Sequence, residues 1–522
     1  MQAANRVIKN TGILYARMAI TVFMSLYATR LILNGLGITD FGIFNVVAGA
    51  ISMLTFLNSA MSAATQRFMS FAEGEGDFSK LKSIFNVSIV LHIIIAILVF
   101  LVLEGVGYFL FNGILKIPES RMEVTKIIFQ FMIVSTLLTI ISVPYDAVIS
   151  AHENMLLFAI LGIIESTLKL AIALYITYTH YDKLIVYGLL TAALTITILT
   201  FKRIYCHKKY TECGININLY FNKSIFRDMA RFAGWSLLGS SSSLFANYGQ
   251  GIVINTFFGP EVNAAQGISS QISGQLGAFS TTLLKALNPI INKSEGGGNR
   301  NLMLKASMTG SRISFFLLIV FYVPVLIEMP YIFSLWLKNV PEYVIIFCRL
   351  LLLRNLIEQL GITLHYSITA VGNIKKYQIF VSIITFFPLV ISYILFNLNF
   401  SAYALYVVFL IFSVVNFIIT LYFANEKCDL SISTYMRDVV FRCFLIFTIL
   451  ITISFIPTLI IHNNLIRLMS VVITSTVCFI ILIWTLGFSF EERLNIRKLA
   501  ITIIKKFDLD KDKTQNILLK ND

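Results

Sequence analysis

About fourteen apolar segments recur along this chain of 522 residues. Each is about 20 residues long, which is the length that an α-helix needs to cross the hydrocarbon core of a bilayer. With 57% hydrophobic residues, 13% charged residues and a mean hydropathy of +0.81, the chain has more apolar surface than a water-soluble core can bury. We therefore predict an all-α polytopic membrane protein. The predicted transmembrane helices lie near residues 11–34, 41–66, 84–104, 125–146, 155–178, 184–201, 230–256, 263–290, 307–333, 342–369, 377–398, 401–424, 438–461 and 466–489.

An internal repeat organises these helices. The stretch 232–299 is rich in Gly, Ser, Asn and Gln, and it resembles the beginning of the chain when it is moved back by 222 positions. Gly259 then falls on Gly37, and the sequence EGGGN at 295–299 falls on EGEGD at 73–77. A match at a fixed offset is typical of transporters that are built from internal repeats. It predicts two six-helix lobes related by a pseudo-two-fold axis, with two extra helices after them.

The predicted division follows the polar connections. The ranges are 1–205 for the first lobe, 206–229 for a linker, 230–425 for the second lobe, 426–489 for extra helices 13 and 14, and 490–522 for a basic tail. Within the tail, apolar residues at helical spacing over 496–507 fit either a short helix on anionic lipid or a solvated basic segment.

The formal net charge of +14 does not indicate nucleic acid, because the basic residues are unevenly placed. Most of the 41 Lys and Arg residues fall on segments that share one side of the membrane, above all 202–231 and the tail. This bias predicts that both termini and the linker are cytoplasmic and that 105–124 faces out. No small-residue cleavage site follows the first apolar run, so we interpret it as a transmembrane helix. Cys206 and Cys213 do not have the spacing of a common zinc site, and no metal is predicted.

Two pairs of opposite charges lie inside predicted transmembrane helices. Glu165 and Lys169 are four residues apart, as are Arg354 and Glu358, so each pair shares a helix face. Ionisable groups at such depth face the bundle interior or a wet cavity. Either each pair is a self-neutralising structural element, or the basic partner binds phosphate and the acidic partner serves ion coupling.

Single cations and amides provide further candidates. Arg17 lies deep enough in the first helix for a role in a cavity, although snorkelling to the headgroups is an alternative. For the basic residues nearer helix ends we favour snorkelling; these are Arg30, Lys285, Arg312 and Arg349. The amides suit either sugar hydroxyls or interhelical hydrogen bonds. The candidates are Asn247, Gln250, Gln271 and Gln275.

Motifs for catalysis are missing from the sequence. It has no phosphate-binding Gly-rich loop, no His-Glu-x-x-His and no nucleophile elbow. No cofactor is predicted, and the chain is not expected to be an enzyme. Proline residues within several predicted helices free backbone carbonyls and provide hinges, which favours a transporter that moves.

Three sequence segments carry a family resemblance: RFAGWSLLGS at 231–240, ALNPIINKSEGGGN at 286–299, and the aromatic-rich run that ends at Tyr343. With the helix layout and the basic linker, they resemble the O-antigen and capsule flippases of the MATE-like multidrug/oligosaccharidyl-lipid/polysaccharide exporter superfamily. The resemblance implies alternating-access transport of an undecaprenyl-pyrophosphate-linked oligosaccharide across a bacterial inner membrane, for lipopolysaccharide or capsule. It also implies cationic cavity residues, for which Lys169, Arg354 and Arg17 are the matching positions.

The implied partners are the lipid-linked oligosaccharide, membrane lipids, a polysaccharide polymerase and glycosyltransferases. Two other functions stay open on the sequence. A cation-coupled multidrug antiporter of the same superfamily would need acidic residues in its first-lobe cavity, where only Glu165 is available. A membrane-embedded polysaccharide polymerase or ligase would be expected to have a larger outer loop than 105–124.

Overall fold

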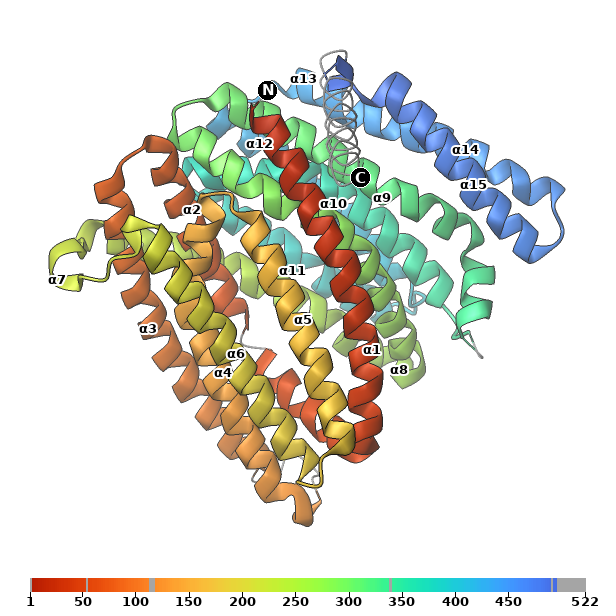
Figure 1. The fold of residues 1–522 in the computed structure, drawn as a ribbon. Helices are drawn as coiled ribbons and strands as arrows, with labels where there is room; N and C mark the ends of the chain where they lie inside the picture. Colours follow the sequence, from red (N-terminus) through yellow and green to blue (C-terminus); the bar gives the residue numbers. More distant parts are fainter. Residues whose placement is uncertain (1, 53–54, 112–117, 338–339, 490–491, 495–522) are drawn as a thin grey trace, which may run out of the picture.

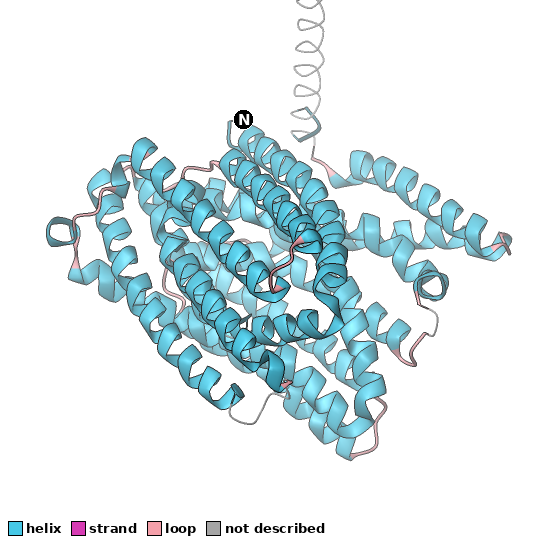
Figure 2. Ribbon diagram, turned by 60° about the horizontal axis from the view of Figure 1, so that its bottom comes forward, coloured by secondary structure: helices cyan, strands magenta, loops and turns pink. Residues whose placement is uncertain are grey.

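The computed structural model describes residues 2–52, 55–111, 118–337, 340–489 and 492–494. The tail segment 496–507, for which an interfacial helix was one prediction, lies outside them. Within the described ranges the regular structure is entirely helical, as Figure 2 shows. This confirms the predicted all-α fold.

The first lobe consists of six helices, and the second has the same number when the kinked helix α8 is counted as two. The first-lobe helices are α1 (Gln2–Ser52), α2 (Thr55–Glu75), α3 (Phe78–Phe109), α4 (Glu119–Ala151), α5 (Met155–Tyr178) and α6 (Lys183–Lys209). The short elements η2 (Thr211–Cys213) and α7 (Ile217–Tyr220) lead to α8 (Lys223–Gly296), α9 (Arg300–Trp336), α10 (Val344–Val371), α11 (Lys375–Asn397) and α12 (Ala404–Cys428). After them come α13 (Ile432–Tyr435), η3 (Met436–Phe441), α14 (Arg442–Ile460), α15 (Asn464–Leu482) and η4 (Ile483–Gly487).

Ten segments of the described helices are long and apolar enough to cross a membrane. The remaining predicted transmembrane helices correspond to the second half of the kinked hairpin that includes α1 and α2, to both halves of α8, and to α10. These segments are richer in Gly, Ser, Asn, Gln or charged residues. Polar side chains in a membrane bundle face neighbouring helices or a cavity, so these segments are the ones expected to line a transport path.

The backbone confirms the internal repeat at several positions. Gly37 interrupts α1 with φ 79° and ψ 169°, and Gly259 interrupts α8 with φ 79° and ψ −176°. Among the amino acids, essentially only glycine adopts this conformation. Gly76 and Gly298 also have positive φ, at 74° and 71°. In each case the two glycines are 222 residues apart, which is the offset predicted from the sequence.

An ion-pair cluster holds together the Gly37 end of the first lobe. Arg121 of α4 pairs with Asp40, which follows the kink in α1, and with Asp182 at the start of α6, where N and O are 2.5 Å apart. Asp182 also caps α6 by accepting hydrogen bonds from the backbone N–H groups of Leu184 and Ile185. Three helices are therefore fixed relative to one another at this end. Figure 1 shows α1 lying along α5 in the same lobe.

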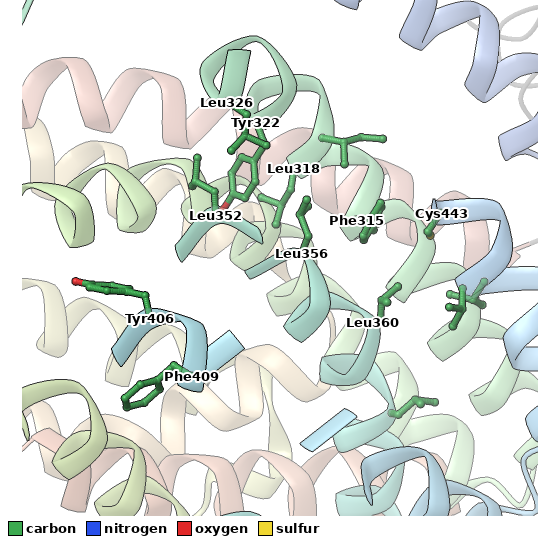
Figure 3. Close-up of a cluster of buried hydrophobic side chains, with 14 of the residues drawn as sticks. Phe315, Leu318, Tyr322, Leu326, Leu352, Leu356, Leu360, Tyr406, Phe409 and Cys443 are labelled. Atoms are coloured by element: carbon green, nitrogen blue, oxygen red, sulfur yellow. The ribbon is translucent and has the colours of Figure 1, made fainter. Parts of the chain in front are cut away.

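The second lobe contains the largest apolar core among the described residues. Leu352, Leu356 and Leu360 recur every four residues on one face of α10, and Figure 3 shows them beside Phe315, Leu318 and Tyr322 of α9. That face of α10 is buried, which leaves its other face for a polar role.

The α14–α15 pair packs on α9, and Figure 1 shows it on the opposite side of the molecule from α3 and α4. Arg467 of α15 donates two hydrogen bonds, of 2.7 and 3.0 Å, to the buried carboxylate of Glu328. Glu328 lies in α9 between Pro324 and Pro330, where the helix departs from regular geometry. The ion pair therefore joins the extra helices to the bend in α9.

Candidate substrate-binding site

The first-lobe cavity, of about 500 Å³, lies between α1, α5 and α6. On α1 its lining includes Arg17, Thr21 and Ser25, which recur every four residues and therefore share a helix face. On α5 it is lined by Gly162, Glu165, Ser166 and Lys169, and on α6 by Tyr187 and Thr191. The sequence-predicted residues Arg17, Glu165 and Lys169 thus meet in one cavity.

Arg17 has the least compensated charge of these three residues. Its guanidinium lies over Gly162, where a β-carbon would collide with it, so the glycine makes room for the side chain. Among the described residues, no carboxylate lies within ion-pair distance of Arg17. By contrast, Lys169 is 2.7 Å from Glu165, and the two side chains are 54% and 40% exposed. Because an exposed ion pair contributes little stability, Lys169 can leave Glu165 and bind an anionic ligand at small energetic cost.

Arg17 also borders an interlobe cavity of about 460 Å³, whose other polar lining residues are Ser62, Gln66, Asp146, Ser150 and Lys285. Lys285 is the contribution of α8, so the cavity has walls from both lobes. The charge of Asp146 is balanced by Lys202, at 2.8 Å. Within the described part of the chain, Lys285 has no acidic partner in an ion pair. Two cations from different lobes therefore border one cavity.

The second-lobe cavity, of about 500 Å³, lies between α8, α10, α11 and α12. The polar face of α10 forms one wall with Arg354, Glu358, Gly361 and His365, at helical spacing opposite the leucine face. Arg354 is 2.7 Å from Glu358, and its guanidinium lies 4.8 Å from the ring centre of Phe409. Both sides of Arg354 are thus occupied, and the charge of the pair cancels.

Uncharged polar groups complete the second-lobe cavity. Asn355 donates from Nδ2 to the Ser273 hydroxyl at 2.7 Å and to the Tyr322 hydroxyl at 3.2 Å. The Nδ1 atom of His365 is 3.1 Å from the Tyr377 hydroxyl. The side-chain oxygen of Asn416, also in the lining, is buried and has no hydrogen-bond partner in the part of the chain that the structure describes.

The predicted amides of α8 separate into different environments. Asn247 lines the second-lobe cavity, whereas Gln250 is buried. Gln271 and Gln275 are exposed and border none of the three cavities described above. Of this group, Asn247 alone lines one of the three cavities described above, and a role for the other three in substrate binding stays a prediction.

Snorkelling was the wrong interpretation for one of these basic residues, Arg312. Arg312 is buried, pairs with Glu492 and donates to the backbone carbonyl of Asp438 at 3.4 Å. Arg349 donates to the carbonyl of Leu326 at 3.2 Å. Arg312 thus bonds within the protein instead of reaching headgroups. Arg349 is half-buried, and snorkelling stays a prediction for it. Arg30, in contrast, is exposed.

Sequence reasoning missed Lys285, Asn355 and Asn416 as cavity residues. Lys285 lies four residues before Pro289, near the end of an apolar segment, which is also the pattern of a snorkelling lysine. Its proximity to Arg17 depends on how α8 packs against the first lobe. For Asn355 a signal was available, because it follows Arg354 on the helix whose polar residues are spaced like a cavity face.

The model of the polysaccharide biosynthesis protein family matches residues 7–295, which is more than half of the chain. This chain belongs to the polysaccharide biosynthesis protein family. The matched range covers nearly all of the first lobe and of α8, and it includes Lys285. A comparison with curated proteins gave no match.

Solved structures give the fold of this family member. A MATE protein in its bent conformation has a TM-score of 0.71 and 14% identity, covering 84% of this chain and 97% of its own. An outward-facing multidrug resistance MATE family transporter of the MOP superfamily has a TM-score of 0.70 and 14% identity, and the match covers 83% of this chain and 97% of that transporter. A MOP superfamily transporter from Pyrococcus furiosus Vc1 is described as having a binding pocket of reverse polarity. It has a TM-score of 0.67 and 15% identity, and the match covers 83% of this chain and 96% of that transporter. This family member therefore has the MATE transporter fold, as the sequence resemblance implied.

Proposed function

We propose that this family member is a flippase that moves an undecaprenyl-pyrophosphate-linked oligosaccharide across the bacterial inner membrane by alternating access. Family and fold together support a membrane transporter and not an enzyme. The observation that carries the proposed substrate is a pair of cations, Arg17 and Lys285, which border the interlobe cavity and have no acidic partner among the described residues. In this proposal both termini are cytoplasmic, and glycosyltransferases and a polymerase act before and after the transport step.

A pyrophosphate is the ligand chemistry that best matches these cations. An uncompensated charge within a membrane protein is unfavourable, so its presence on a cavity indicates a charged ligand. The planar guanidinium of Arg17 can bind two phosphate oxygens at once, and the ammonium of Lys285 provides a point charge from the second lobe. Lys169 can join them from the first-lobe cavity, because Arg17 lines both cavities.

The position of the cations on different lobes connects binding to movement. Arg17 belongs to α1 and Lys285 to α8, so separating the lobes would pull the two charges apart. A pyrophosphate held by both cations stabilises the arrangement in which the lobes are close at this level, and a ligand shifts an equilibrium only by such differential binding. Release then accompanies the rearrangement that separates Arg17 from Lys285.

The proposed substrate is tested with purified protein in proteoliposomes that contain undecaprenyl pyrophosphate bearing an oligosaccharide. We expect Arg17→Gln and Lys285→Gln each to reduce the flipping rate by about tenfold, equivalent to about 1.4 kcal/mol. Arg30→Gln is the matched control, because Arg30 is an exposed arginine of the same helix that borders none of the three cavities. Parental flipping rates in both cavity variants would refute the cationic site.

A further inference from the structure

We propose that the second-lobe cavity is a subsite for a neutral sugar unit of the substrate, separate from the cationic cavities that receive the pyrophosphate. This inference rests on the proposed function and adds a division of labour between the lobes. The charged part of the lipid-linked substrate is recognised at the first lobe and the lobe boundary. The uncharged glycan is recognised within the second lobe.

The charge of the second-lobe cavity supports a neutral ligand. Its only ion pair is between Arg354 and Glu358, within the part of the chain that the structure describes, and the two charges cancel at 2.7 Å. The other polar lining groups are amides, hydroxyls and the imidazole of His365. A phosphate or a uronate would find no free cation here, whereas sugar hydroxyls would find both donors and acceptors.

The apolar part of the lining also fits a sugar ring. Phe409, Phe412 and Phe417 line the cavity from α12, the helix that also carries Asn416. A pyranose has C–H groups on its faces and hydroxyls on its edge, so aromatic rings and amides are complementary to different parts of it. The volume of about 500 Å³ lies in the ordinary range of ligand pockets, about 300–1,000 Å³.

Asn416 provides the sharpest indication of a ligand. Its side-chain oxygen is buried and has no hydrogen-bond partner among the described residues, although it belongs to the cavity lining. Leaving a buried acceptor unsatisfied is unfavourable by about 1–3 kcal/mol. A hydroxyl group of a bound sugar would satisfy this oxygen. Asn355 differs, because its amide nitrogen is already held by Ser273 and Tyr322.

The test replaces Asn416 with leucine, which has a similar shape but no polar atoms. Folding should not suffer, because the substitution removes an unsatisfied oxygen and not a protein–protein hydrogen bond. Tyr406→Phe is the matched control. Tyr406 is on the same helix, as Figure 3 shows, and it does not line the cavity. Its hydroxyl is also buried without a partner among the described residues.

Binding is measured in nanodiscs with undecaprenyl pyrophosphate alone and with the same lipid carrying one hexose, one N-acetylhexosamine or one hexuronic acid. For the parent protein we expect tighter binding of at least one neutral glycolipid than of the sugar-free lipid, with no such gain for the hexuronate. Asn416→Leu should weaken binding of that neutral glycolipid by about tenfold and leave the sugar-free lipid unchanged. Tyr406→Phe should match the parent with every lipid.

The outcomes separate the two proposals. If no sugar strengthens binding, or if Asn416→Leu binds all lipids as the parent does, the sugar subsite is refuted while the pyrophosphate site stands. If the parent binds the sugar-free lipid no better than undecaprenol, the proposed function fails at its cationic site. Equal weakening by Asn416→Leu of the sugar-free lipid would also refute the subsite, because the residue would then act on the lipid or the fold.

Discussion

Gly74 of α2 and Gly296 of α8 make equivalent contacts across the boundary between the lobes. Gly74 lies against the backbone carbonyl of Lys293, and Gly296 lies against that of Phe71. Residues 71 and 293 are 222 positions apart, as are 74 and 296, so the contact is reciprocal under the repeat. Glu73 adds an ion pair with Lys293 at 3.3 Å. Two helix ends are thus packed together with no room for a side chain, and the lobes are closed at this end.

Alanine at Gly74 or Gly296 is predicted to obstruct this closure. At either position the added β-carbon would collide with backbone atoms, which cannot rotate away as a side chain can. We expect at least a tenfold loss of flipping rate at normal protein yield, because the closed arrangement becomes unfavourable while each lobe can still fold.

Gly277→Ala is the control for the closure variants. Gly277 lies in α8 as well, but a β-carbon there would have no neighbour within 4 Å. Flipping by Gly74→Ala and Gly296→Ala at the rate of Gly277→Ala would contradict a role for the closed end in the transport cycle.

The kinks at Gly37 and Gly259 lead to a prediction about stability. Both have φ 79° with nearly extended ψ, a combination that is strained for any residue with a β-carbon. Replacing either glycine with alanine should lower the free energy of unfolding by about 1–3 kcal/mol, and valine should have a larger effect. Thermal unfolding in detergent measures this, with Gly42→Ala as a control at a helical glycine with open surroundings. Unchanged unfolding of both kink variants would contradict the predicted strain at the two positions.

Much of the fold was predictable because its determinants are local. Apolar length predicts the helices, and the positive φ of Gly37 and Gly259 belongs to turns in which one residue type is strongly preferred. The repeat could be found for the same reason, since EGEGD and EGGGN encode similar helix ends. Asp77 and Asn299 each accept a hydrogen bond from a backbone N–H three residues later.

The candidate site was only partly predictable because its decisive contacts join distant segments. The pairing of Glu165 with Lys169 follows from helical spacing, and the structure shows it. The approach of Lys285 to the cavity that Arg17 borders depends on the packing of α8 on α1 and on the first lobe. Likewise, the burial of Arg312 depends on Glu492, 180 residues later. No local pattern specifies such neighbours.

Glu212 provides a prediction about pH, outside the membrane-spanning helices. Its carboxylate is 2.5 Å from Nε2 of His152, whose other ring nitrogen is 3.4 Å from Glu73. Burial raises the pKa of Glu212, but the hydrogen bond with His152, a backbone N–H and the charges of His152 and Lys82 outweigh it. The pKa is thereby lowered from the usual 4.5. Because the folded-state value is the lower one, the stabilisation is complete above about pH 4.5 and is lost as the pH falls through the lowered pKa.

We therefore expect Glu212→Gln to lower the free energy of unfolding by about 1.5–3 kcal/mol near pH 7, the contribution of a hydrogen bond to a charged group. The difference from the parent should shrink as the pH falls below 4.5 and through the lowered pKa, because the parent carboxylate then becomes protonated in the folded protein as well. Unfolding by denaturant at both pH values measures this. Glu75→Gln is the control, because Glu75 pairs at the surface with Lys80 and should show little effect at either pH. If the difference in unfolding free energy between the parent and Glu212→Gln does not change with pH, the stabilisation does not come from the ionised carboxylate of Glu212.

The two intramembrane charge pairs are predicted to behave differently, although their spacing and their N–O distances of 2.7 Å are the same. Lys169 is 54% exposed in a cavity that also contains Arg17, so it is available to an anionic ligand. Arg354 is only 17% exposed and is held by both Glu358 and Phe409. We expect Lys169 to bind substrate and Arg354 to be chiefly structural.

Single and double variants separate these roles. Lys169→Met and the double change with Glu165→Gln should both reduce flipping, because the cation is absent in each. Arg354→Met alone should lower protein yield, since it leaves Glu358 uncompensated, while the double change with Glu358→Gln should restore both yield and flipping because no unpaired charge is then left. Flipping rate and membrane yield are measured for all four variants. Full flipping by the Lys169→Met/Glu165→Gln protein would exclude Lys169 from the pyrophosphate site, and a well-expressed Arg354→Met/Glu358→Gln protein without flipping would show that Arg354 acts on the substrate.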